Sequence, residues 1–426
     1  MKNRLLILCY ILALTACTGE ERVNKHNEQF HLLWNKTITA SLDEALWLNE
    51  YAYDASTTLM LPMHYAYRYP HRFDVDPRDN FYTFIEHTYF YSDFSAYEGN
   101  VTKYQFLYFI TQNLKLEQAR GNLNEEILAW VSEIIVNNWE NNAYSIWDGV
   151  VFRGVKERLK WNFSEPETKY SFYRAVIDQE WFTLAAMNDL AVVYDNANKP
   201  TPFNNDEVKL LSKQLIDNFG TYEGDRWFFQ RGVWHDHRDY RYAGNDSITA
   251  DMNISEIESI GIDSNHLHRL PLWLLSFKEN NVLDQAVFTA ALKGHKNAYE
   301  TLVLTYKEAN KGFMLLQNNY STGENGVYRY NYITQGQGNG YQAFELSGAL
   351  FSGYYAFLDS KIYREGMFKM VGQFPLSQEA LDFYVGPNTT RIRHPMFAWP
   401  AYFENGFAEM FSRVVACYNT DLVDCE

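Results

Sequence analysis

The chain has 426 residues, a formal net charge of −16 and an aromatic content of 17%. Such an acidic balance argues against nucleic acid as a partner and against docking on anionic lipid through charge. No stretch approaches the roughly 20 consecutive apolar residues that a transmembrane helix needs. These properties leave a globular protein.

The first residues predict export. Lys2 and Arg4 precede an apolar run that ends in Leu14-Thr15-Ala16-Cys17, which is the order of a secretory signal with a small-residue cleavage site. These last four residues resemble the lipobox of bacterial lipoproteins. The resemblance implies diacylation of Cys17 and, with Thr18 following, a Gram-negative outer-membrane lipoprotein on the periplasmic or cell-surface side. An ordinary signal peptide that happens to contain a cysteine is the alternative.

We expect a signal peptide over residues 1–16, a polar tether over 17–27 and a single domain over 28–426, since no Pro/Gly/Ser-rich linker divides the chain. Loss of the two cations in the signal takes the formal charge from −16 to −18. Cys417 and Cys425 then remain besides the lipidated cysteine. In an oxidising compartment they predict a disulfide rather than a metal site, because no histidine or further cysteine lies near them.

Helical periodicity dominates from the tether onward. The segment 124–138 has apolar residues at the i, i+1, i+4, i+7, i+8 spacing of one buried stripe, and Ser41 is a plausible N-cap for a helix over 42–53. Short alternating runs at 226–229 and 326–333 predict strands or loop arms. The further expected helices are residues 103–116, 169–194, 206–219, 266–277, 283–299, 300–310, 341–358 and 401–418. We predict an all-α protein built from paired antiparallel helices.

The chain combines this succession of helices and loops with an export signal and with 32 Tyr and 11 Trp residues. In this combination it resembles the α/α toroid of many periplasmic carbohydrate-active proteins. The resemblance implies an incomplete or complete helical barrel whose long aromatic loops line a sugar cleft. Aromatic faces stack on sugar rings, but a helical core rich in Phe and Tyr gives the same composition.

The stretch 226–273 holds the densest set of groups that titrate near neutrality. It contains four of the eleven histidines (His235, His237, His266 and His268) and five arginines, so we expect chemistry there. Its last part, from Asp263, precedes the helix expected over 266–277, and the N-terminus of a helix favours anions.

A looser resemblance, to the toroidal polysaccharide lyases, implies roles for these residue types. In that family Asn or Arg neutralises a uronic carboxylate, His or Tyr takes the C5 proton, and Tyr or His protonates the leaving oxygen. The catalytic candidates here are His266, Asn265, Tyr240, Tyr242, His235 and His237. The candidates for substrate binding are Arg238, Arg241, Arg269, Trp234, Tyr330, Arg393, His394 and Trp399. The predicted partner is an anionic polysaccharide or oligosaccharide, and no cofactor is required.

Three alternatives remain open at this point. His235 and His237 are spaced as two imidazoles on one side of a strand, so a divalent metal such as zinc could bind there. A glycoside hydrolase on the same fold would need two carboxylates facing each other across a cleft. A glycan-binding or envelope lipoprotein without turnover would need neither the lyase residue types nor the paired carboxylates. The carboxylates available for hydrolysis are Asp178, Glu180, Asp236, Asp239, Glu256, Glu258, Asp263 and Glu345.

Overall fold

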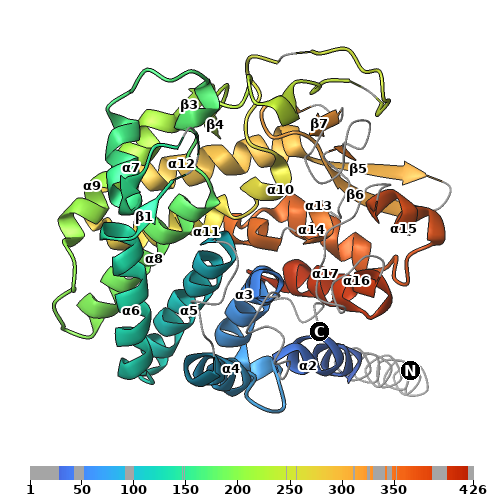
Figure 1. Ribbon diagram of the computed structural model, residues 1–426. Coiled ribbons are helices and arrows are strands. Elements are labelled where there is room, and N and C mark those ends of the chain that lie inside the picture. Colours follow the sequence, from blue (N-terminus) through green and yellow to red (C-terminus); the bar gives the residue numbers. More distant parts are fainter. Residues whose placement is uncertain are drawn as a thin grey trace, which may run out of the picture.

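A computed structural model gives the fold. It describes residues 28–42, 52–91, 100–145, 147, 149–245, 247–255, 257–309, 312–323, 327–329, 341–342, 348–351, 353–385 and 401–420. Most of these residues are helical, which confirms the predicted helical class (Figure 1). No helix in this part of the chain is long and apolar enough to cross a membrane.

One set of helices packs in succession through the middle of the molecule. α3 contacts α5, α5 contacts α8, α8 contacts α11, and α11 contacts the 3-10 segment η8. α17 lies against α13, η8 and α3, so the succession returns to its start. The bounds are Ala52–Arg68 (α3), Asn100–Arg120 (α5), Asp178–Asn196 (α8), Leu270–Asn280 (α11), Gly348–Phe351 (α13), Gly353–Leu358 (η8) and Phe407–Cys417 (α17). α8 is buried on nearly all its faces: many of its residues are apolar or small, and the buried polar side chains Glu180, Asn188 and Asp189 contact Arg158, Ser212 and Lys115.

A second set of helices covers the first and buries only one stripe each. α6 lies on α5 and α8, α9 on α8, α12 on α11, and α14 on α17. The stripe predicted for α6 is confirmed, since Ile127, Val131 and Ile135 are buried, and Asn124 caps its N-terminus. The bounds are Arg78–Tyr91 (α4), Glu125–Glu140 (α6), Gly154–Phe163 (α7), Asn205–Phe219 (α9), Gln285–Ala298 (α12), Lys361–Val371 (α14) and Gln378–Val385 (α15).

The strands that the structure describes form four antiparallel hairpins. The strand predicted at 226–229 is confirmed as β4, which pairs with the residues directly after α9. The pairs are Ala143–Tyr144 (β1) with Phe152–Arg153 (β2), Gly220–Glu223 (β3) with Arg226–Phe229 (β4), Leu304–Ala309 (β5) with Gly312–Gln317 (β6), and Val327–Arg329 (β7) with Tyr341–Gln342 (β8).

Several predicted helices are wrong or shorter than expected. The segment 300–310 forms a π-helical turn and then β5, because its alternating residues pair with β6. The segment 341–358 contains β8, α13 and η8 instead of one helix. The last predicted helix is divided into α16 (Ala401–Glu404) and α17 by Gly406, whose φ of 99° only glycine adopts readily. Ser41 is not an N-cap, since it lies within helical residues and its hydroxyl donates to the Thr37 carbonyl at 2.5 Å.

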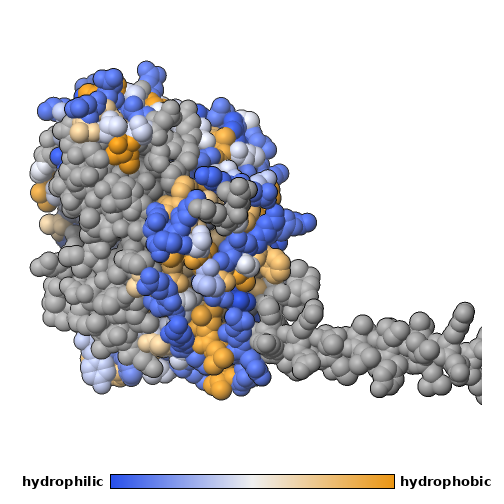
Figure 2. Space-filling model, turned by 90° about the vertical axis from the view of Figure 1, so that its right-hand side faces the viewer, coloured by the Kyte–Doolittle hydropathy of each residue, from blue (hydrophilic) through white to orange (hydrophobic). Residues whose placement is uncertain are grey.

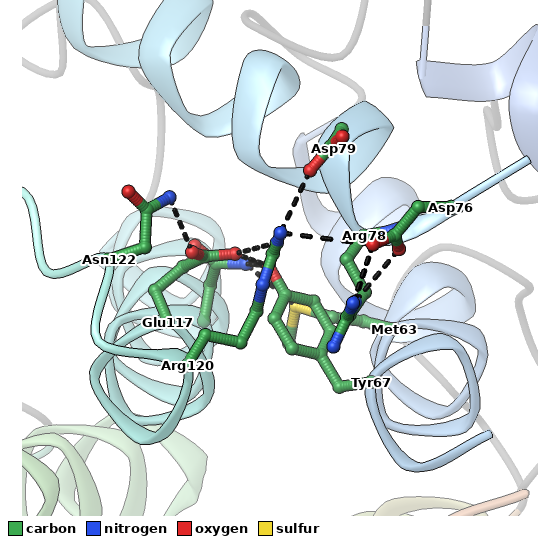
Figure 3. Close-up of polar contacts among 9 residues, drawn as sticks. Met63, Tyr67, Asp76, Arg78, Asp79, Glu117, Arg120 and Asn122 are labelled. Atoms are coloured by element: carbon green, nitrogen blue, oxygen red, sulfur yellow. Dashed lines mark hydrogen bonds and ion pairs between the residues drawn. The ribbon is translucent and has the colours of Figure 1, made fainter. Parts of the chain in front are cut away.

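Where Figure 2 colours the surface, hydrophilic residues predominate, with a group of hydrophobic residues in the lower part. A partly exposed polar network joins the ends of α3 and α5 to the start of α4 (Figure 3). Glu117, with a side chain 1% exposed, accepts hydrogen bonds from Tyr67, from Arg120 at 3.1 Å and from Asn122 at 2.8 Å. Arg120 also donates to Asp79 at 3.1 Å. This network fixes one end of the helical succession, away from the stretch 226–273.

Glu180 gives the fold a predictable pH dependence. Its carboxylate is fully buried, 3.4 Å from Nε of Arg158, and burial raises its pKa from 4.5 to about 7 although Arg158 opposes the rise. Between these two pH values the folded protein holds a proton that the unfolded chain releases, so the free energy of unfolding should fall as pH rises through this window. In the Glu180→Gln variant the free energy of unfolding, measured with urea, should change less between pH 5 and pH 7 than in wild type.

Glu207 provides the control, because a hydrogen bond from Lys160 lowers the pKa of its carboxyl. Its contribution is lost only as the pH falls below about 4.5, so Glu207→Gln should keep the wild-type slope between pH 5 and pH 7. Parallel profiles for wild type and Glu180→Gln would contradict the assignment.

Candidate functional site

The stretch 226–273 folds into an irregular segment and a broken helix. After β4, the described residues of the segment 230–263 (all but 246 and 256) form no α-helix or β-strand and one 3-10 turn, Arg238–Tyr240. Trp234, Tyr240 and Ile260 form a small apolar cluster of their own, with Phe172 packed against it. This cluster fixes the irregular segment against the residues that precede α8.

The helix predicted over 266–277 is two helices. α10 covers only Ser264–Leu267, and α11 begins at Leu270 with Pro271 in its first turn. Proline lacks an N–H donor and disfavours the helical conformation of the residue before it, so the chain cannot run through as one helix. Asp263 caps α10 and accepts the His266 N–H at 3.0 Å. The helix at whose N-terminus an anion site was expected has a single turn, and its own cap accepts from one donor there. The anion site itself stays a prediction.

Asp263 instead orients the ring of His266. Its Oδ2 lies 2.7 Å from Nδ1 of His266 and accepts the Tyr240 hydroxyl at 3.1 Å. The Asp263 side chain is 1% exposed, whereas that of His266 is 23% exposed. A carboxylate that accepts from Nδ1–H fixes the tautomer in which Nε2 carries a lone pair. Nε2 makes no hydrogen bond with the described residues, which is the arrangement that a general base needs.

Replacing Asp263 by asparagine should separate catalysis from stability. Asparagine caps a helix about as well as aspartate, so the melting temperature should change little. Its amide would donate to Nδ1 and move the proton of His266 to Nε2, which removes the base. We expect the turnover of the uronic-acid polysaccharide predicted from the sequence to fall by about 10²- to 10⁴-fold. The initial rate measures turnover, and a thermal melt of the same variant measures stability. A rate within a few-fold of wild type would show that His266 does not act through Asp263.

Arg269 lies in the core beside this pair. Its side chain is 2% exposed, one NH group lies 2.5 Å from Asp178 at the start of α8, and the other donates to the Tyr53 hydroxyl at the start of α3. Arg269 was predicted to bind substrate. Its guanidinium is buried and donates to Tyr53, whose own side chain is only partly buried. Tyr53 was not predicted: the hydrogen bond joins residues 216 positions apart, and no local signal indicates it.

His235 lies in a different place. It lines an open hollow of about 1000 Å³ together with Arg174, Arg231 and Glu258. Its Nδ1 is 2.7 Å from the Gly232 carbonyl and 3.2 Å from the Ser171 hydroxyl. The lining includes neither His266 nor Tyr240, so the structure divides the predicted catalytic residues into two groups.

The carboxylates considered for hydrolysis are also dispersed. Asp178 pairs with Arg269, Glu180 is buried beside Arg158, and Asp236 accepts from the Ser171 N–H at 2.7 Å. Glu258 is exposed in the wall of the hollow. Glu256 and Glu345 lie outside the described residues.

The other predicted residues of the irregular segment have separate environments. The His237 ring packs edge-on against Phe172 at 4.6 Å, and its Nδ1 accepts the Asp239 N–H at 3.2 Å. Trp234 is 8% exposed in the same cluster. Within the described parts of the chain no three His, Cys, Asp or Glu side chains are arranged to hold a metal ion.

Arg238 is 55% exposed, with Asp239 4.0 Å away. Arg241 and Tyr242 follow directly and are partly buried. Asn265 belongs to α10, but its side chain is outside the description. The remaining predictions concern residues outside the described ranges and stay predictions: Tyr330, Arg393, His394, Trp399, Cys17 and Cys425. Cys417, the expected partner of Cys425, is buried at the end of α17.

Comparison with known protein families, with curated proteins and with solved structures gives no match. The geometry of the site is therefore the basis on which a function is argued.

Proposed function

We propose that this protein is a polysaccharide lyase that cleaves a uronic-acid glycan by β-elimination, carried on an α/α toroid. The ring formed by α3, α5, α8, α11, η8 and α17, covered by α4, α6, α9, α12 and α14, supports the toroid. We further propose that the toroid is tethered to the outer membrane through lipidated Cys17.

The observation that carries the proposal is the Asp263–His266 pair. Abstraction of a C5 proton requires an imidazole nitrogen with a free lone pair, and the 2.7 Å contact between Nδ1 and Asp263 orients the ring so that Nε2 is that nitrogen. The imidazolium that forms is stabilised by the same carboxylate. Tyr240 is 3% exposed and donates to Asp263, so we assign it to positioning Asp263.

Tyr53 is the proposed proton donor to the leaving group. As the C5–H bond breaks toward Nε2 of His266, a C4–C5 double bond forms and the C4–O bond breaks, and the departing oxygen takes the Tyr53 proton. The Arg269 guanidinium donates to the phenol oxygen and stabilises the negative charge left there. Water then returns the proton from His266 to Tyr53. Arg238, which is 55% exposed, would attract the anionic polymer to a chain that is otherwise acidic.

A glycoside hydrolase is the second candidate, and one observation favours it. Glu165 and Glu167 line the hollow together with Glu258, so carboxylates stand on more than one of its walls. Hydrolysis there would proceed without His266.

Two assays on the mature domain distinguish these functions. A panel of uronate polysaccharides is followed for ultraviolet absorbance of the unsaturated product and, in parallel, for new reducing ends. A lyase raises both signals. Reducing ends without absorbance would indicate hydrolysis, and no signal in either assay would indicate a glycan-binding protein without turnover.

A further inference from the structure

The open hollow of about 1000 Å³ is lined by an arginine that has no polar partner in the described part of the chain. Arg174 ends a 3-10 turn, Ser171–Arg174. Its terminal nitrogens Nη1 and Nη2 are not buried, and they make no hydrogen bond or ion pair with the described residues. A guanidinium presents its N–H groups as a planar fork that matches a carboxylate. The outer edge of Arg174 is therefore open to an anion in the hollow.

Arginines with less exposure than Arg174 have counter-charges. Arg158 lies 3.4 Å from Glu180, and Arg413 lies 2.7 Å from Glu409. Arg174 is partly buried, and its Nε is buried without an acceptor. The side chain has thus lost part of its hydration without gaining a carboxylate in return, which is unfavourable. An anion bound in the hollow would supply that charge.

His235 adds a second group to the same wall. Ser171 and Arg174 are three residues apart in the 3-10 turn, and side chains at this spacing leave such a turn on the same side. The Ser171 hydroxyl is 3.2 Å from Nδ1 of His235. Nδ1 also lies 2.7 Å from the Gly232 carbonyl, which can only accept, so Nδ1 carries a proton. Nε2 is not buried and makes no hydrogen bond with the described residues, so it is open to the hollow beside Arg174.

These two groups define the chemistry of an occupant. The guanidinium of Arg174 matches a carboxylate, and Nε2 of His235 matches a hydroxyl, which can donate to a neutral ring or accept from a protonated one. The side chains of Glu165, Glu167 and Glu258 are exposed in the walls of the hollow. Their charges disfavour a ligand with more than one negative charge. The occupant therefore carries one carboxylate and at least one hydroxyl.

We propose that the hollow binds a hydroxylated monocarboxylate such as a sugar acid, whose carboxylate accepts from Arg174 and whose hydroxyl meets Nε2 of His235. The volume of about 1000 Å³ is at the upper end of small-molecule sites, so a molecule of this size fits. The lining of the hollow includes neither Asp263 nor His266. The inference therefore does not depend on lyase activity.

The test uses the mature protein with its histidine ring nitrogens labelled with ¹⁵N. Gluconate should shift the Nε2 signal of His235 saturably, and this signal is assigned by its absence from the His235→Ala spectrum. Three further probes each change one feature of gluconate: sorbitol lacks the carboxylate, hexanoate lacks the hydroxyls, and inorganic phosphate carries more than one negative charge. Each should bind at least about tenfold more weakly than gluconate.

Arg174→Gln should weaken the binding of gluconate at least about tenfold, because the carboxylate loses its cation. Arg364→Gln is the control for net charge and should keep the wild-type affinity, since Arg364 pairs with Asp359 and does not line the hollow.

Equal affinity of sorbitol and gluconate, or of Arg174→Gln and wild type for gluconate, would overturn the proposal, and the first comparison requires no variant to fold. Hexanoate or phosphate binding as tightly as gluconate would overturn the assignment to a hydroxylated monocarboxylate. If no probe saturates the signal, the hollow holds only water and the proposal is wrong.

Discussion

His266→Ala should lower the turnover of a uronate polysaccharide by about 1000-fold or more, with a melting temperature close to that of wild type. The variant removes the proposed base, and general acid–base groups contribute about 10²- to 10⁴-fold to rate. Its side chain is 23% exposed and bonds only Asp263 among the described residues, so the fold should tolerate the change. The measurement is the initial rate of ultraviolet absorbance beside a thermal melt.

His235→Ala is the matched control. His235 is also a partly buried histidine of the irregular segment, but it lines the hollow instead of contacting Asp263. Its variant should keep turnover within a few-fold of wild type. If His235→Ala abolished turnover and His266→Ala did not, the active site would be in the hollow.

Arg269→Met should reduce the free energy of unfolding by about 3–5 kcal/mol. Arg269 is 2% exposed, and its removal leaves the Asp178 carboxylate, 12% exposed, without its cation. The substitution also removes the hydrogen bond from Arg269 to the Tyr53 hydroxyl. Turnover of the uronate polysaccharide should therefore fall in the protein that remains folded. Urea unfolding measures the change in stability.

Arg231→Met is the control for this variant. Arg231 pairs with Glu223 at 2.7 Å, but both side chains are considerably exposed, at 29% and 50%, and exposed pairs contribute about 0–1 kcal/mol. A loss below 1 kcal/mol for Arg269→Met would contradict its description as a buried ion pair that holds the start of α8.

Local sequence signals predicted helices where the signals and the packing agree. The apolar stripe of the segment 124–138 located α6. The segment 300–310 was misassigned because its charged residues suit an exposed helix, whereas pairing with β6, a tertiary contact, makes it a strand. The division of 266–277 was predictable in principle from Pro271.

The site was predictable only in part for the same reason. Asp263 and His266 are three residues apart, so their contact follows from local capping geometry. Tyr240 reaches Asp263 from 23 positions away, and Arg269 reaches Tyr53 from 216; such contacts depend on how helices pack. His235 was grouped with His266 because both are in the stretch 226–273. The apolar cluster around Trp234 packs the irregular segment so that the two histidines lie in different places.

Mass spectrometry of the products tests the central claim most directly. The mature protein and His266→Ala are incubated with the uronate polysaccharide panel, and the oligosaccharides released are weighed. β-Elimination adds no water, so each wild-type product that carries a new, unsaturated non-reducing end should be lighter by one water than the corresponding hydrolysis product, and His266→Ala should release none. Products that carry the added water, or equal release by both proteins, would contradict a lyase that acts through His266.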